Sequence, residues 1–320
     1  MHRPTLTDMT AKVSPGAARD DGAPAPGPAR STAAAPLLVF TSVVTVQFGQ
    51  AFGKQLSVSV GASGVVALRL GLAALLLLLV HRPALPRSWS QVRLVLAFGT
   101  SIAGMNLIYP AMRDLPLGLA VSLQLLGPVV LALVTSRQLR DLLFAGCAAG
   151  GVWLFHSPAG TSYPLGGMLL ALAAGASMAA YLLLSRQAGA HTRDGGPLAL
   201  ALAWAAVLTV PIGVAENGRA LLEPVTLAAG LAVAVLSAVL PYSLELAALR
   251  LVPPRIVAVL QSLEPAAGGA AGLLVLGERL HPAQWLALGC VGVACAGTVA
   301  GVRRRGSRRE DVNGPSAPPR

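Results

Sequence analysis

The chain has 320 residues, of which 54% are hydrophobic and only 12% are charged, and its formal net charge is +11. An ordinary soluble domain is about 25% charged, so this composition excludes a soluble globular protein and indicates a membrane protein. With a cytoplasmic N-terminus, 19 of the 24 Lys and Arg residues fall in predicted cytoplasmic segments. That asymmetry follows the positive-inside rule. The basic charge therefore reports membrane topology, and we expect no nucleic-acid partner.

Apolar runs long enough to cross a bilayer recur along most of the chain. A hydrocarbon core of about 30 Å needs about 20 helical residues. By this measure the sequence predicts ten transmembrane helices, at residues 36–52, 63–80, 94–111, 117–135, 139–155, 165–184, 197–214, 227–249, 256–277 and 285–302. The flanking residues 1–35 and 303–320 are charged and rich in Pro, and we expect disordered cytoplasmic tails there. The basic C-terminal tail is also able to contact anionic lipid.

A short internal repeat divides the predicted helices into two halves. When the chain is shifted by 137 residues, "RDLPLGLAVSLQLLGP" at 113–128 aligns with "RLVPPRIVAVLQSLEP" at 250–265. An odd number of spans per half means that the second half enters the membrane from the opposite side. The sequence therefore predicts an all-α membrane protein built from two inverted five-helix repeats, residues 36–156 and 165–302. Such inverted repeats are typical of alternating-access carriers.

An acidic residue lies in the middle of the ninth predicted span. Glu264 is about 12 Å from the cytoplasmic end of that helix. An acid at this depth costs on the order of 2.5–3.5 kcal/mol on insertion scales and marks an ion, proton or substrate pathway. The alternative is a protonated or hydrogen-bonded Glu264 that holds two helices together. Pro265 follows directly and leaves the carbonyl of Gln261 without its helical partner, so we expect the helix to bend there.

Three further prolines inside predicted spans each release a carbonyl oxygen four residues earlier. They are Pro110, Pro128 and Pro241, which free the carbonyls of Asn106, Gln124 and Ser237. Free carbonyls at membrane depth are tolerated where they face protein or line a cavity. We therefore expect these helices to face a polar pathway, with a purely structural kink as the alternative for each.

Other polar residues in the spans are candidates for the same pathway. Arg69 lies about 9 Å inside the second span and could bind a carboxylate, snorkel to the interface or pair with an acid. Glu245 lies about 6 Å from the cytoplasmic end of the eighth span, so it is either a site residue or a solvated interfacial acid. Gln47 and Gln50 are three apart in the first span and could share a polar face.

Signatures of catalysis and metal binding do not occur in the sequence. We find no H-E-x-x-H, G-x-S-x-G or Walker A pattern, and no histidine well inside a span. Cys147, Cys290 and Cys295 lie in predicted spans and lack the spacing of a metal pair. We expect neither an enzyme nor an ATP-driven pump, and no cofactor, metal site or disulfide.

Several segments resemble the drug/metabolite transporter superfamily with two EamA-type repeats. They are "GVVALRLGLA" (64–73), "AGMNLIYPAMRDLPLGLAVSLQLLGP" (103–128), "ALAAGASMAAYLLLSRQAGA" (171–190), "LSAVLPYSLELAALRLVPPR" (236–255) and "LEPAAGGAAGLLVLGERLHPAQWLALG" (263–289). The last segment resembles the end of an EamA repeat, a hairpin turned at Gly277 with Pro282 opening the next helix. "PYSLE", together with the segment at 103–128, resembles the threonine/homoserine exporters of the RhtA type.

The resemblance implies a secondary carrier of the bacterial inner membrane, with both termini cytoplasmic. It implies a small-molecule substrate such as threonine or homoserine, expelled in exchange for protons, with membrane lipid around it. Two departures bear on the substrate: Gln124 stands where these exporters tend to have Glu, and Met178 where a Trp is expected. An exporter of another metabolite or drug stays open, as does a non-transporting scramblase, channel or assembly partner.

A mechanism can be written from these residues. We expect Glu264 to face the ammonium group of a zwitterionic amino acid, with Arg69 the candidate for its carboxylate, and a proton from outside to neutralise Glu264 and release the substrate. The freed carbonyls of Gln124 and Gln261 and the side chain of Asn106 would hydrogen-bond the rest. The candidate substrate-binding residues are Arg69, Asn106, Gln124, Tyr242, Glu245, Gln261 and Glu264, with Glu264 also the candidate for proton coupling.

Overall fold

The computed structural model describes residues 30–135, 146–147, 150–151, 163–191, 195–251, 260–294 and 296. The backbone of this part of the chain is helical and contains no strand, and five of its helices are long and apolar enough to cross a membrane. Shorter apolar helices accompany them at Leu117–Leu131, Glu264–Leu276 and Pro282–Ala294. The protein is thus all-α, as predicted. The predicted span at 139–155 and both tails lie wholly or largely outside the described residues.

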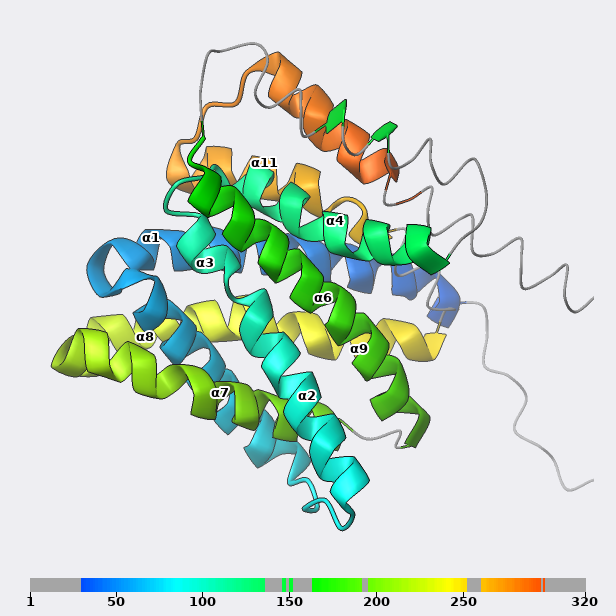
Figure 1. Cartoon of the computed structure of the whole chain (residues 1–320), viewed down its shortest axis with the longest axis vertical. Helices are drawn as coiled ribbons and strands as arrows, with labels where there is room; N and C mark the ends of the chain where they lie inside the picture. Colours follow the sequence, from blue (N-terminus) through cyan, green and yellow to red (C-terminus); the bar gives the residue numbers. More distant parts are fainter. Residues whose placement is uncertain are drawn as a thin grey trace, which may run out of the picture.

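The elements follow the predicted spans closely in chain order (Figure 1). They are α1 (Arg30–His81), α2 (Trp89–Met105), α3 (Ile108–Ala111), α4 (Leu117–Thr135), α6 (Leu165–His191), α7 (Gly196–Asn217), the 3₁₀ turn η1 (Gly218–Leu222), α8 (Pro224–Ala234), the π-helix η2 (Val235–Val239), α9 (Leu240–Leu251) and α11 (Glu264–Leu276). The predicted helix at 117–135 has the same bounds as α4.

The first two predicted spans form α1, which is sharply broken at Gly61 (Figure 1). Gly61 has φ 62° and ψ 169°, a combination that only glycine adopts readily. The break divides α1 into a first limb, residues 30–59, and a second limb, residues 62–81. Because Gly61 permits this turn without a connecting loop, both limbs pack against the rest of the molecule at once.

The two limbs pack against different helices. The first limb lies against η2, α9 and α11, and the Ser42 hydroxyl donates a hydrogen bond to the Pro241 carbonyl over 3.2 Å. The second limb lies against α7 and α8. On the other side of the molecule, α4 lies between α6 and α11, and α2 between α6 and α7. Helix α1 of the first predicted half is therefore packed mainly against helices of the second.

The eighth predicted span is divided by the π-helix η2. The N–H of Leu240 bonds to the carbonyl of Val235, five residues earlier. A π-turn of this kind interrupts an α-helix and frequently occurs at functional sites. Pro241 follows with no N–H to offer, so the Ser237 carbonyl has no helical partner. The sequence had predicted this free carbonyl, whereas the π-turn itself was not foreseen.

The ninth predicted span is interrupted rather than bent. Ser262 and Leu263 form a turn, and α11 begins at Glu264 with Pro265 in its first turn. Proline is well tolerated there because the first N–H groups of a helix have no intrahelical acceptor. The interruption is a short turn in which Leu263 keeps right-handed dihedral angles (φ −80°, ψ −9°), and it places Glu264 at the start of α11. At its other end α11 closes on Gly277, in the left-handed conformation (φ 67°), as predicted for the hairpin.

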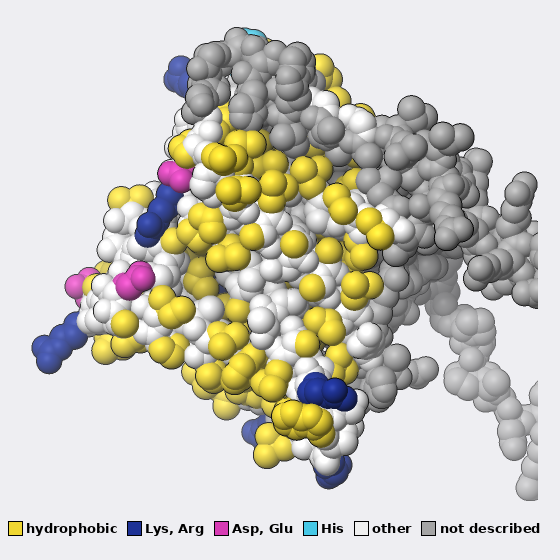
Figure 2. Space-filling view, viewed as in Figure 1, with side chains coloured by type: hydrophobic (Ala, Val, Ile, Leu, Met, Phe, Trp, Pro, Cys, Tyr) yellow, Lys and Arg dark blue, Asp and Glu magenta, His cyan; other side chains and the backbone are white. Residues whose placement is uncertain are grey.

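Large apolar side chains cover much of the surface. Val58, Val134 and Leu274 are 90%, 80% and 72% exposed. Figure 2 shows hydrophobic side chains spread across the described face, with charged side chains restricted to its margins. A soluble monomer rarely exposes so much contiguous apolar surface. Together with the apolar helices, this surface identifies a multi-pass integral membrane protein.

Candidate functional site

Arg69 lies in the second limb of α1 and is held inside the molecule, where it is 8% exposed. Its Nε donates to the Ser237 hydroxyl over 2.6 Å and its Nη2 to the Ser237 carbonyl over 2.8 Å. Its Nη1 donates to Oδ1 of Asn106, and the guanidinium carbon lies 5.8 Å from the centre of the Tyr109 ring. Arg69 therefore does not snorkel, and it is the donor that uses the carbonyl freed by Pro241.

The charge of Arg69 has only neutral partners within the described residues. The one ion pair in this part of the chain joins Lys54 and Glu278. A guanidinium group carries five N–H donors, and the three hydrogen bonds above occupy three of them. Buried charges are normally paired with an opposite charge. Arg69 thus has both the unbalanced charge and the free donors to accept a carboxylate.

Asn106 orients Arg69 by its side chain. Its Nδ2 donates to the Ile102 carbonyl over 2.7 Å, which turns Oδ1 toward Arg69. Its carbonyl, freed by Pro110, accepts the N–H of Tyr109 over 3.0 Å. The side chain of Asn106 therefore belongs to the site, while its freed carbonyl is satisfied by the local backbone.

The acidic candidates lie together at the junction of α9 and α11. Glu245 lies near the Gln261 side chain and interacts electrostatically with Glu264. Glu245 is partly buried. The structure thus places Glu245 beside Gln261 and Glu264, which favours a site residue over a solvated interfacial acid.

Tyr242 connects the acidic residues with Arg69. It interacts electrostatically with both Arg69 and Glu245. Tyr181, which reaches in from α6, interacts with Tyr242 and Glu245. Six of the seven predicted site residues therefore converge. We refer to them, with Ser237, as the central cluster: Arg69, Asn106, Ser237, Tyr242, Glu245, Gln261 and Glu264.

Gln124 lies at the edge of this cluster. Its Nε2 donates to the Met105 carbonyl over 3.2 Å, which links α4 to α2. Its own carbonyl faces Gly175 of α6, where a Cβ would lie 2.5 Å from the oxygen. The carbonyl freed by Pro128 therefore serves a close helix contact, and the described contacts do not join Gln124 to Arg69 or Glu264.

Two residues that contact Arg69, Ser237 and Tyr109, were not among the sequence candidates. Pro241 pointed to the carbonyl of Ser237 but not to its hydroxyl, which also accepts from Arg69. Tyr109 is a fully buried aromatic residue in α3, and nothing in its spacing distinguished it from core. Both contacts join residues that are far apart in sequence, so only the fold reveals them.

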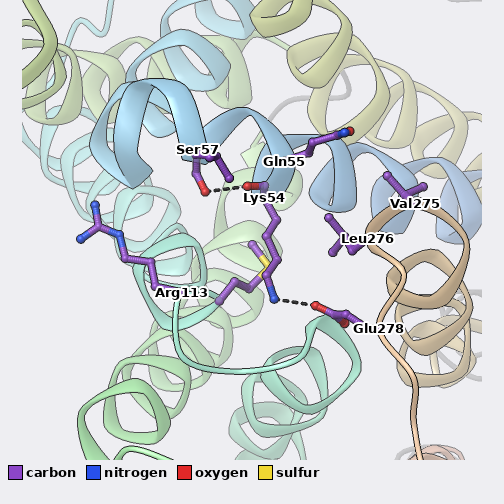
Figure 3. Close-up of a pocket in the computed structure, with 9 residues that line it drawn as sticks. Lys54, Gln55, Ser57, Arg113, Val275, Leu276 and Glu278 are labelled. Atoms are coloured by element: carbon purple, nitrogen blue, oxygen red, sulfur yellow. Dashed lines mark hydrogen bonds and ion pairs between the residues drawn. The ribbon is translucent and has the colours of Figure 1, made fainter.

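A second group of charged residues, Lys54 and Glu278, lies where the first limb of α1 meets the start of α4 and the end of α11. We call this group the outer rim. Lys54 Nζ is 2.6 Å from Glu278 Oε1 and donates to the Leu115 carbonyl over 2.8 Å. Glu278 Oε2 accepts the N–H of Leu117 over 2.9 Å. Figure 3 shows Lys54 and Glu278 meeting beside a cavity of about 470 Å³ that Arg113 also lines. The rim ties the end of the first limb of α1 to the start of α4 and the end of α11.

A second cavity of about 300 Å³ adjoins the central cluster. Asn106 and Arg113 line it from the α2–α3 region, Ser63 from the second limb of α1, and Thr209 and Glu216 from α7. Asn106, which bonds to Arg69, also lines this space, so the cavity adjoins the central cluster through Asn106.

The chain is similar in sequence to a known family and to several named proteins. The EamA-like transporter family matches residues 165–300. The threonine/homoserine exporter RhtA of Escherichia coli (strain K12) is 40% identical over 285 residues, which cover 87% of this chain and 95% of that protein. The exporter RhtA of Salmonella typhimurium (strain LT2) is 41% identical over 275 residues, covering 84% of this chain and 92% of that protein.

Two more distant likenesses extend this result. The uncharacterized transporter YwfM of Bacillus subtilis (strain 168) is 25% identical over 236 residues, covering 71% of this chain and 80% of that protein. A solved crystal structure, 17% identical, superposes with a TM-score of 0.57 over 85% of this chain and 99% of that one. At that identity the structural likeness shows a shared fold.

Proposed function

The chain belongs to the EamA-like transporter family, so it is a transporter and not an enzyme, and from this premise we propose that it exports small amino acids such as threonine and homoserine in exchange for protons. The relatives that are 40% identical over 95% of their length are named threonine/homoserine exporters, which supports the substrate class. We place it in the bacterial inner membrane as two inverted five-helix repeats, with both termini in the cytoplasm. The uneven placement of Lys and Arg supports that orientation.

The observation that carries the proposal is the division of charge within the central cluster. A buried cation, Arg69, and the carboxyl group of Glu245 both interact electrostatically with Tyr242, and Glu245 also interacts with Glu264. A zwitterionic amino acid has the complementary division, because its carboxylate and ammonium carry opposite charges on neighbouring atoms. In this proposal Arg69 binds the carboxylate of the substrate, and Glu264 with Glu245 binds its ammonium group.

The same two acids account for coupling to protons. Two neighbouring carboxylates repel one another, and either an ammonium group or a proton between them relieves that repulsion. A proton that arrives from outside would therefore compete with the substrate for Glu264. Since the pair holds one or the other, the proton expels the amino acid and the protonated carrier returns to load again.

Alternating access requires that one end of the pathway be closed while the other is open. The outer rim supplies a closure, because the ion pair between Lys54 and Glu278 links the first predicted half to the second. In this proposal the substrate leaves past the rim, through the larger cavity, which shares Arg113 with the cavity beside Asn106. Glu264, at the interrupted start of α11, is positioned to respond to that movement.

The test is transport by the full chain in proteoliposomes. We expect saturable flux of labelled threonine and homoserine that rises when a pH gradient is imposed. Glu264→Gln keeps the shape of the side chain and removes its charge, so the gradient should no longer accelerate flux. Glu223→Gln, at an exposed acid just before α8, is the matched control and should behave as wild type.

Each result has a distinct meaning. Gradient-independent, non-saturable flux in the wild type would indicate a channel, and no flux of any amino acid would indicate an exporter of another metabolite or a protein without transport activity. A Glu264→Gln variant that still responds fully to the gradient would assign Glu264 a structural role and remove it from the coupling mechanism.

A further inference from the structure

A glutamine near the central cluster is buried without hydrogen bonds. Gln47, in the first limb of α1, is 0% exposed, and neither its Nε2 nor its Oε1 has a partner. Oε1 of Gln50, one turn further along the same limb and 9% exposed, likewise has none. Leaving a buried polar group unpaired costs about 1–3 kcal/mol, so each such group in a folded protein needs an explanation.

The position of Gln47 offers an explanation for its unpaired amide. Its Oε1 faces Gly268 of α11, where an added Cβ would lie 3.1 Å from the oxygen. Gly268 follows Glu264 by four residues, so the two share a face of α11. Gly49, two residues after Gln47, packs directly against Ser237, the partner of Arg69. Residues two apart point to nearly opposite sides of a helix, so the amide faces α11 on the side that carries Glu264, while the opposite side of the same limb packs against η2.

The chemistry of an amide suits one part of the substrate. In the proposed function Arg69 binds the carboxylate and Glu264 the ammonium group, so only the side chain of the amino acid is left to recognise. An amide presents a donor and an acceptor side by side, and a hydroxyl group both donates and accepts a hydrogen bond. An apolar substrate side chain would instead leave the amide unpaired.

We propose that Gln47 is a specificity-determining residue that hydrogen-bonds the side-chain hydroxyl of the substrate, with Gln50 beside it. The inference rests on the proposed function and narrows its substrate class to amino acids that carry a hydroxyl group. The present structure is a state in which the amide faces Gly268. Gly268 has no side chain, so Oε1 of Gln47 approaches α11 closely, and a substrate hydroxyl would bind the amide by drawing it away from this contact.

Valine provides the test, because it has the shape of threonine with a methyl group in place of the hydroxyl. A site built to bond a hydroxyl rejects the analogue that lacks it. We expect wild type to prefer threonine over valine in competition for transport. In Gln47→Met, which keeps the size and loses the polar atoms, we expect that preference to fall about tenfold or more. Gln91→Met, at an exposed glutamine of α2, should retain it.

Stability separates this role from a structural one. Removing an unpaired buried amide should leave the thermal midpoint of Gln47→Met equal to or above that of wild type, because no hydrogen bond is lost. A lower midpoint with an unchanged preference would mean that Gln47 supports the fold, and the inference would be overturned.

A second variant leaves the glutamine in place. Gly268→Ala puts a methyl group against Oε1 and should displace the amide by a few tenths of an ångström. We expect the preference for threonine over valine to fall in this variant too, and an unchanged preference counts against the inference. If wild type transports neither threonine nor homoserine, the proposed function fails and the inference falls with it. If wild type transports both threonine and homoserine but neither variant lowers the preference for threonine over valine, the inference fails and the proposed function stands.

Discussion

The outer rim and the central cluster both contain charged residues, but these residues have different kinds of partner in the two places. At the rim Lys54 and Glu278 form an ion pair, and their remaining groups bond to the backbone at Leu115 and Leu117. These side chains are 21% and 17% exposed. In the cluster the cation Arg69 is 8% exposed and has neutral partners.

This difference separates a structural contact from a binding site. Charges that neutralise each other have little to offer a ligand, and their role is to hold segments together. Charges that are buried apart from each other, with unused donors, are expensive unless a ligand or a conformational change pairs them. The contrast supports the proposal that the rim is the closing contact of the carrier and that the cluster, with Gln47 beside it, is its binding site.

The largest effect expected from this comparison is that of Arg69→Lys. An ammonium group keeps the charge but cannot make the forked contact with both oxygens of Ser237. We expect transport of threonine to fall at least about tenfold, and the free energy of unfolding to fall by about 1–3 kcal/mol because the Ser237 carbonyl loses its partner. Initial transport rates and thermal unfolding in detergent measure the two quantities.

Arg93→Lys, at an exposed arginine of α2, is the matched control and should change neither quantity. If Arg69→Lys were as active as wild type, the fork on Ser237 would be irrelevant to substrate binding, and the contrast with the rim would lose its functional meaning.

The next effect concerns Gly61, whose turn separates the limb of α1 that carries Lys54 of the rim from the limb that carries Arg69. Gly61→Ala meets no atom closer than 3.5 Å, so its cost comes from the backbone conformation alone. We expect the free energy of unfolding to fall by about 1–3 kcal/mol. Gly166→Ala, in the first turn of α6 with open space around it, should leave stability unchanged or raise it.

Thermal unfolding of the two glycine variants side by side checks this expectation. Equal midpoints would show that the break in α1 carries no strain for other residues, and that the placement of the two limbs depends on their packing instead.

The smallest effect is expected at the rim itself. Ion pairs with this degree of exposure contribute about 0.2–1 kcal/mol. A double-mutant cycle of Lys54→Met and Glu278→Gln should give a coupling energy in that range, and it should shrink as salt is raised because exposed charges are screened. A coupling that is several-fold larger and insensitive to salt would mean that the rim behaves like the buried cluster, and the comparison would have to be abandoned.

Much of the site could be predicted from the sequence because membrane burial makes polar residues conspicuous. Glu264, Arg69 and Asn106 stood out within apolar runs, and Pro241 marked the Ser237 carbonyl that Arg69 uses. Other features could not be predicted. The π-turn η2 and the break before α11 depend on how neighbouring helices take up freed backbone groups. Glu245 could not be assigned until its contact with Gln261 was known.

The sequence by itself determined that the chain is an apolar, all-α membrane protein. It also determined where most of the helices lie and which polar residues fall within the membrane-spanning segments. These are properties of composition and local spacing, because hydropathy and proline chemistry act over a few residues. Only the tertiary structure decided which of those residues meet. The partners Arg69 and Ser237 are 168 positions apart, and packing of the second limb of α1 against the helices of the second predicted half brings them together. Tertiary packing likewise leaves Gln47 without a partner, because no local pattern controls which buried groups find one.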